Sequence, residues 1–150
     1  MTLLLAYWKA CCLAALVAFM HAEIPTPEGE EDYREALAAA IVTASPLDPQ
    51  EQRQLAMLAR YESGYVPRLG APRCECKPWE CDQGRAKGAF QHLSDRCPFS
   101  LEADARIALR HVRTSVAALQ DLPKEERLSL YCRGRASDEG KRLSRVRYAP

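Results

Sequence analysis

Apolar residues recur every three or four positions in three separate stretches of the chain, which is the spacing of one face of an α-helix. These stretches cover residues 33–44, 49–63 and 101–119. No run of alternating apolar and polar residues predicts a long strand. We therefore expect a mostly helical fold with little or no β-structure, and any sheet confined to the loop around residues 74–87.

The second stretch carries a start signal and a stop signal. Asp48 can cap a helix, Pro49 suits the first helical position, and Glu51 has the spacing of a capping box. Gly64 stands where a left-handed residue ends a helix. Glu62 therefore falls in the last helical turn.

Ser100 can cap the third helix, whose first turn holds Glu102 and Asp104. These two acids suit the positive end of the helix dipole. A further helix is expected to start at Pro123, and a basic helix is expected over residues 138–147.

The N-terminus resembles an export signal. Lys9 precedes the apolar run 10–20, and His21-Ala22 offers a small residue before Glu23, so residues 1–22 are predicted to be a signal peptide. An uncleaved membrane anchor is the alternative, because the apolar stretch is nearly long enough to span a bilayer. Residues 23–29 are then expected to form a flexible leader, and residues 30–150 a single domain.

The charge of the chain is nearly balanced but unevenly placed. The formal net charge is +1, which gives no indication of nucleic-acid binding. Residues 23–35 carry six acids and one base, whereas residues 127–150 carry seven bases and two acids. The basic tail could meet an anionic polymer such as a cell wall, or form a solvated helix face.

The seven cysteines have a different meaning if the chain is exported. Removal of residues 1–22 would leave five, enough for two disulfides and one thiol. Cys74 and Cys76 are too close to pair with each other. We expect the loop that carries them to be stapled to the segment near Cys97.

The same cysteines offer an alternative as zinc ligands. Cys74, Cys76 and Cys81, followed by Cys97 or His92, supply enough donors, but the spacing lacks the paired CxxC knuckles of structural zinc sites. We predict no metal site and no cofactor. A small zinc or thiol-redox protein remains a third hypothesis.

Glu62 is the candidate for acid chemistry. It faces the negative end of the helix dipole, and Tyr61, Tyr65 and Val66 beside it could remove water. Both effects disfavour an ionised carboxylate and raise its pKa. A carboxylic acid that keeps its proton near neutral pH can serve as a general acid.

Three short runs resemble the ordered motifs of lytic transglycosylases of the SLT type, which have a lysozyme-like fold. The family motifs usually read Glu-Ser, Gly-Leu-Met-Gln and Ala-Tyr-Asn. The runs here are Glu62-Ser63-Gly64-Tyr65, Gly88-Ala89-Phe90-Gln91 and Leu130-Tyr131-Cys132-Arg133-Gly134. Cys132 replaces the usual Asn, so it is either a structural cysteine or, less consistently with the sequence, a nucleophile.

The resemblance implies a lysozyme-like helical domain that cleaves the β-1,4 bond between N-acetylmuramic acid and N-acetylglucosamine. Glu62 would be the catalytic acid and base, and Ser63, Gln91 and Tyr131 would bind substrate. The expected partners are peptidoglycan glycan strands, with no nucleic acid and no stable membrane insertion after cleavage. A monomer in the periplasm, or secreted from the cell, is expected.

Two other functions fit the same residues. A hydrolytic muramidase would place a second carboxylate across the bond, for which Asp82 and Asp95 are the candidates. A lysozyme-like module that binds wall glycans without cleaving them would need no acid with a raised pKa.

Overall fold

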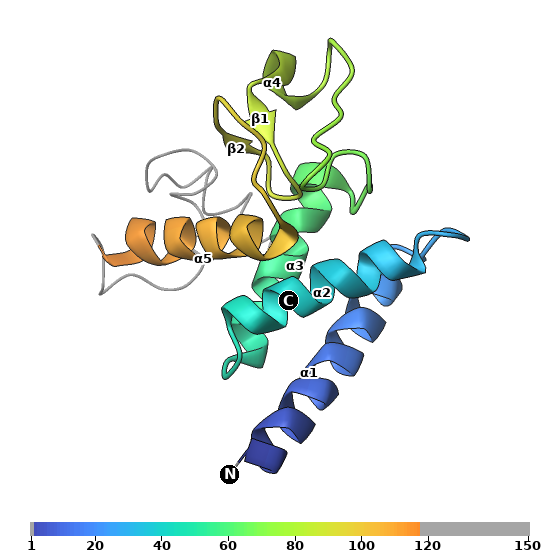
Figure 1. Cartoon of the computed structure of the whole chain (residues 1–150), viewed down its shortest axis with the longest axis vertical. Coiled ribbons are helices and arrows are strands. Elements are labelled where there is room, and N and C mark those ends of the chain that lie inside the picture. Colours follow the sequence, from blue (N-terminus) through green and yellow to red (C-terminus); the bar gives the residue numbers. More distant parts are fainter. Residues whose placement is uncertain (1, 118–150) are drawn as a thin grey trace, which may run out of the picture.

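The computed structural model describes residues 2–117, which form a group of helices below a small loop-rich lobe (Figure 1). The elements, in chain order, are α1 (Thr2–Glu23), α2 (Glu31–Ala44), α3 (Pro49–Ser63), α4 (Cys81–Gly84), β1 (Ala86–Lys87), β2 (His92–Leu93) and α5 (Leu101–Ala117). The prediction of a mostly helical fold with a disulfide-stapled loop is confirmed. The helices expected after Pro123 and over residues 138–147 lie outside the described residues.

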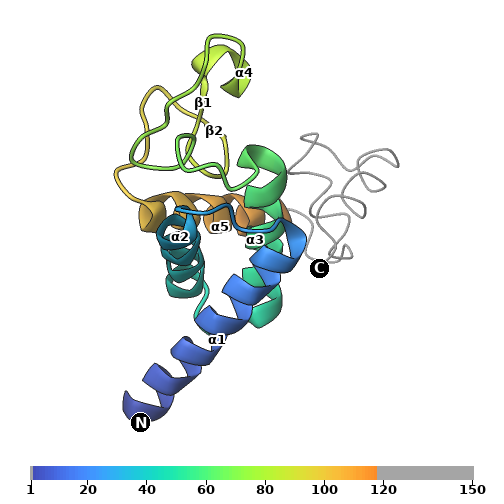
Figure 2. The same cartoon turned by 90° about the vertical axis from the view of Figure 1, so that its right-hand side faces the viewer.

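The core lies where α1, α2, α3 and α5 meet (Figure 2). α1 and α5 contribute small or aliphatic side chains from one face, as the apolar spacing predicts, whereas α3 lies deeper and buries the five consecutive residues 55–59. Phe90, from the loop-rich lobe, is fully buried in the same cluster. The lobe is therefore packed onto the helices through its own apolar residues. The fully buried representatives are Met20, Leu37, Ile41, Leu55, Leu58, Tyr65, Ala89, Phe90 and Ala105.

The sheet is one short antiparallel pair, in which Ala86 pairs with Leu93 and Lys87 with His92. The prediction that any sheet would be confined to residues 74–87 is wrong for β2. The 88–91 turn reverses the chain, so the residues that pair with β1 must come after it. Two residues per strand were too few to give an alternating sequence pattern.

The N-terminal helix α1 combines a free end with a packed end. Leu3 and Leu4 are exposed, whereas Leu16 and Met20 are buried against the core. Among the described residues, α1 is the helix long and apolar enough to cross a membrane, and its N-terminal place also fits a signal sequence. Glu23, the first residue of the predicted leader, ends α1, and residues 24–30 form no helix or strand. Ile24 packs against the core.

Arg34 fastens α1 to the rest of the fold. Its guanidinium is almost fully buried in α2 and donates hydrogen bonds to the backbone oxygens of Met20, at 3.2 Å, and Ile24, at 2.9 Å. It also lies 4.4 Å from the ring centre of Tyr65. A buried charge needs such partners, so Arg34 links the end of α1, α2 and Tyr65, two positions after the end of α3.

Candidate functional site

Both ends of α3 are formed by the cap residues that the sequence predicts. The Asp48 carboxylate accepts hydrogen bonds from the backbone N–H groups of Gln50 and Glu51, each at 3.0 Å. Gly64 is left-handed, with φ of 61°, and its N–H donates to the Arg60 oxygen at 2.8 Å. Glu62 therefore lies in the last turn, as predicted, and its side chain is half-buried.

Glu51 does not complete a capping box. Its carboxylate instead contacts the Ser45 hydroxyl and pairs with Arg113 of α5 at 2.8 and 3.0 Å. The prediction was wrong here because a partner 62 positions away competes with the local backbone N–H. The result is a direct link between the start of α3 and α5.

Ser63 and Tyr65, which both follow Glu62, fix the backbone at the C-terminal end of α3. Ser63 is buried, and its hydroxyl donates to the Ala59 oxygen at 3.0 Å. Tyr65 has a positive φ of 59°, an unusual conformation for a residue with a side chain. Its ring is fully buried and its hydroxyl donates to the Ala56 oxygen at 2.9 Å, which fixes that conformation. Burial raises the pKa of the Tyr65 hydroxyl.

The second motif forms the turn between β1 and β2. Gly88 has φ of 81° and Gln91 has φ of 50°, so the turn uses a left-handed residue at each end. The Gln91 side-chain amide donates to the Gly88 oxygen at 2.9 Å, and the Gln91 backbone N–H donates to the same oxygen at 3.2 Å. The carboxamide is thereby folded onto the turn.

Asp104 is a site residue that the sequence reasoning assigned only to the helix dipole. It is fully buried, and its Oδ2 accepts a hydrogen bond from the Ala89 N–H at 2.6 Å. Its Oδ1 lies 3.2 Å from His92 Nε2. A signal was present, because Asp104 shares the helix face of Leu101 and a buried charge on that face requires a partner.

His92 is held between the turn and α5. Only 9% of its side chain is exposed, and its ring lies 6.1 Å from the rings of both Phe90 and His111. The pKa of His111 is lowered, mainly by burial of its ring and to a smaller extent by the nearby His92. These contacts favour a packing role for His92 over a substrate contact.

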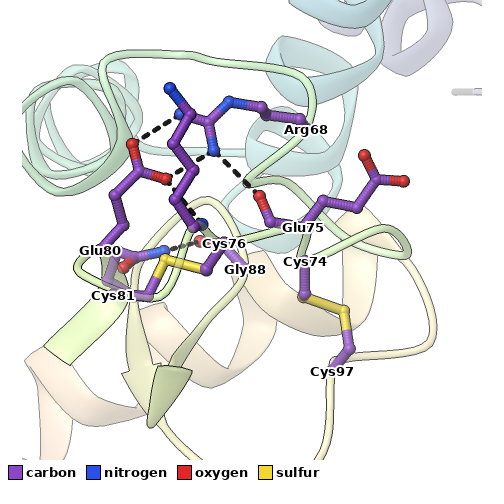
Figure 3. Close-up of a disulfide and its surroundings, with 10 residues drawn as sticks. Arg68, Cys74, Glu75, Cys76, Glu80, Cys81, Gly88 and Cys97 are labelled. Atoms are coloured by element: carbon purple, nitrogen blue, oxygen red, sulfur yellow. Dashed lines mark hydrogen bonds and ion pairs between the residues drawn. A yellow bond between two sulfur atoms is a disulfide. The ribbon is translucent and has the colours of Figure 1, made fainter. Parts of the chain in front are cut away.

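Two disulfides shape the loop that precedes the hairpin (Figure 3). Cys74 is bonded to Cys97, which confirms the prediction that the loop is stapled to the segment near Cys97. Cys76 is bonded to Cys81 within the loop, a pairing that the sequence left open. The first bond closes a segment that contains α4, the hairpin and the 88–91 turn. These four cysteines carry no thiolate for zinc, and no cluster of three metal-binding side chains occurs within residues 2–117.

A paired arginine and glutamate hold the same loop. Arg68 donates to both oxygens of Glu80, at 2.6 and 2.7 Å, and to the Glu75 oxygen at 3.0 Å (Figure 3). The Lys77 N–H donates to Glu80 at 3.0 Å. The bonds from Arg68 and then from Lys77 lower the pKa of the Glu80 carboxyl to about 2.

The candidates for a second carboxylate are both in exposed loop positions. Asp82 pairs with Arg85 at 2.8 Å, on the left-handed turn of α4, and Asp95 follows β2. Both side chains are exposed to solvent. Tyr131 and Cys132 lie outside the described residues.

The first motif, residues 62–65, and the second motif, residues 88–91, both contribute side chains to the same hydrophobic core. Tyr65 and Phe90 belong to one cluster of buried residues, and the C-terminal end of α3 lies on the side of the molecule that carries the hairpin (Figure 1, Figure 2). Comparison of the chain with protein-family models, curated proteins and solved structures gave no match. A functional interpretation therefore rests on these residues themselves.

Proposed function

We propose that this protein is a lytic transglycosylase that cleaves the β-1,4 bond between N-acetylmuramic acid and N-acetylglucosamine in peptidoglycan, with Glu62 as its acid and base. The supporting observation is the position of Glu62. It is a half-buried carboxyl in the last turn of α3, before an αL end. The C-terminal end of α3 lies on the side of the molecule that carries the hairpin (Figure 1). The matching order of the motifs in the sequence points to the same reaction.

The reaction needs a single carboxyl group. Glu62 gives its proton to the glycosidic oxygen as the bond from that oxygen to the muramoyl C1 breaks. The resulting carboxylate then takes the proton of the muramoyl 6-hydroxyl while that oxygen bonds to C1. The products are a free sugar hydroxyl and a 1,6-anhydromuramoyl end, and Glu62 regains its proton without consuming water.

The other motif residues are assigned to substrate positioning. Gln91 uses its side-chain N–H for the Gly88 oxygen, so its carbonyl oxygen is the atom suited to accept a hydrogen bond from a sugar. Ser63 donates to Ala59, so its hydroxyl oxygen can serve a sugar only as an acceptor. Tyr131 is assigned to positioning on the resemblance alone.

The proposed site of action is the periplasm or the exterior of the cell. The apolar N-terminal helix fits a signal sequence, and disulfides persist in oxidising compartments. Peptidoglycan strands lie in such a compartment. The protein is expected to act on them as a monomer without a cofactor.

The test compares wild type with Glu62→Gln on purified peptidoglycan, with products analysed by mass spectrometry. Glutamine keeps the size of the side chain but is not a carboxylic acid, so turnover should fall by about a hundredfold or more. Glu102→Gln, an exposed change in the first turn of α5, is the matched control and should cleave normally. Equal turnover of wild type and Glu62→Gln would disprove the assignment.

The products also separate the two alternative functions. Reducing muramoyl ends, together with loss of activity in Asp82→Asn, would identify a muramidase, whereas anhydromuramoyl ends and an unaffected Asp82→Asn fit the transglycosylase. Glycan binding by wild type and Glu62→Gln without cleavage by either would identify a binding module.

A further inference from the structure

We infer that Asp104 is a positioning residue, which sets the place of the Gln91 carboxamide by orienting the peptide group between Gly88 and Ala89. This role in substrate binding rests on the proposed function. The contacts within the protein that carry the inference do not depend on it.

The first of these contacts is the hydrogen bond from the Ala89 N–H to Asp104 Oδ2 at 2.6 Å. The carboxylate is fully buried, so the bond is shielded from water, and a charged acceptor makes it stronger than a neutral one. A buried carboxylate without that donor would be strongly unfavourable. Asp104 and the Ala89 N–H therefore hold each other in place.

The second contact is steric. A Cβ atom added at Gly88 would lie 2.7 Å from Asp104 Cγ, far inside normal contact distance, and Gly88 also has a positive φ. The carboxyl group of α5 thus occupies the space that a side chain at position 88 would need. The turn can approach α5 this closely because position 88 is glycine.

The link to Gln91 follows from the geometry of one peptide group. The N–H that Asp104 holds belongs to Ala89, and the carbonyl of the same planar group belongs to Gly88. That carbonyl accepts the hydrogen bond from Gln91 Nε2 at 2.9 Å. In a trans peptide the N–H and C=O point in opposite directions. Asp104 therefore fixes the plane of the peptide group through its N–H, and the C=O on the opposite side then fixes the Gln91 side-chain amide.

His92 contacts the second oxygen of Asp104 less favourably. Oδ1 lies 3.2 Å from His92 Nε2 but has no hydrogen bond of good geometry within the described residues. The hold on the turn is therefore made chiefly by Oδ2. Substitutions that remove this oxygen should affect Gln91 more than they affect the packing of His92.

The kinetic test uses Asp104→Ala and Asp104→Asn, with exposed Glu102→Gln as the control on the same helix. The alanine variant should raise KM for peptidoglycan fragments by about tenfold, in the range of a lost charge-assisted hydrogen bond. The asparagine variant should raise it less, because its amide oxygen can still accept from Ala89. In both, kcat should stay within about threefold of wild type, whereas Glu62→Gln should lower kcat.

A double substitution distinguishes positioning from a general structural role. If Asp104 acts through Gln91, Asp104→Ala should add little to the effect of Gln91→Ala on KM. Fully additive effects, or an unchanged KM in Asp104→Ala, would overturn the inference.

A measurement that needs no catalysis keeps the two proposals separate. In NMR spectra of the full chain, Asp104→Ala, which removes the acceptor, should shift the Ala89 amide signal and speed solvent exchange of the Gln91 side-chain amide. This result would support the inference even if wild type does not cleave peptidoglycan. A shifted Ala89 signal with unchanged exchange at Gln91 would overturn it.

Discussion

Loss of the Cys74–Cys97 disulfide should destabilise the fold more than loss of the Cys76–Cys81 disulfide. The first bond joins cysteines 23 positions apart and the second joins cysteines 5 apart. Restriction of the unfolded chain then gives about 3.4 kcal/mol for the longer loop and about 2.1 kcal/mol for the shorter one. The difference should be about 1.3 kcal/mol, because the longer loop has more conformational freedom to lose in the unfolded chain.

Paired serine substitutions, Cys74 with Cys97 and Cys76 with Cys81, avoid leaving a reactive thiol behind. Denaturant unfolding of each double variant gives the change in free energy, with exposed Glu102→Gln as the control. Wild type from an oxidising compartment should show at most three free thiols, the seven cysteines less the four in these bonds. More free thiols, or an equal loss from both pairs, would refute the reasoning.

Two further predictions concern acid and export. The ion pair between Arg68 and Glu80 should stabilise the fold at pH values above 4.5, the ordinary pKa of the Glu80 carboxyl. This contribution should be lost as the pH falls toward about 2, the pKa of Glu80 in the folded chain. The reason is that Glu80 takes up its proton at a higher pH in the unfolded chain than in the folded chain. The stability gap between wild type and Glu80→Gln should therefore narrow between about pH 6 and about pH 3, and a constant gap in urea unfolding contradicts this. The protein recovered outside the cytoplasm should begin near Glu23, and N-terminal sequencing that finds intact Met1 on soluble cytoplasmic protein would count against export.

Features set by neighbouring residues could be predicted from the sequence. The bounds of α3 follow from Asp48, whose side chain caps the first turn, and from Gly64, whose left-handed conformation ends the last turn. Ser100 likewise caps α5, and its hydroxyl accepts from the Ala103 N–H at 3.1 Å. The place of Glu62 in the last turn depends only on these local signals.

Features that depend on distant partners were missed or assigned wrongly. Glu51 has the spacing of a capping box, but its carboxylate goes to Arg113. The sequence assigned Asp104 only to the favourable end of the helix dipole, whereas in the structure its carboxylate accepts a hydrogen bond from the Ala89 N–H of the hairpin. Helical periodicity shows which face is apolar, but it does not show which segment a polar group on that face will meet.

If the chain is cleaved after Ala22, as predicted, then cleavage and folding act on the same segment, because α1 packs against the core. The bond after Ala22 lies within a helix whose preceding turn buries Met20 and whose last residue, Glu23, contacts Arg60. A protease would reach this bond only while the helix end is open. A chain cut before folding must close its core without Leu16 and Met20, and must find new acceptors for Arg34 in place of the Met20 oxygen. A chain that folds first shields the bond, so the order of the two events determines which N-terminus the protein has.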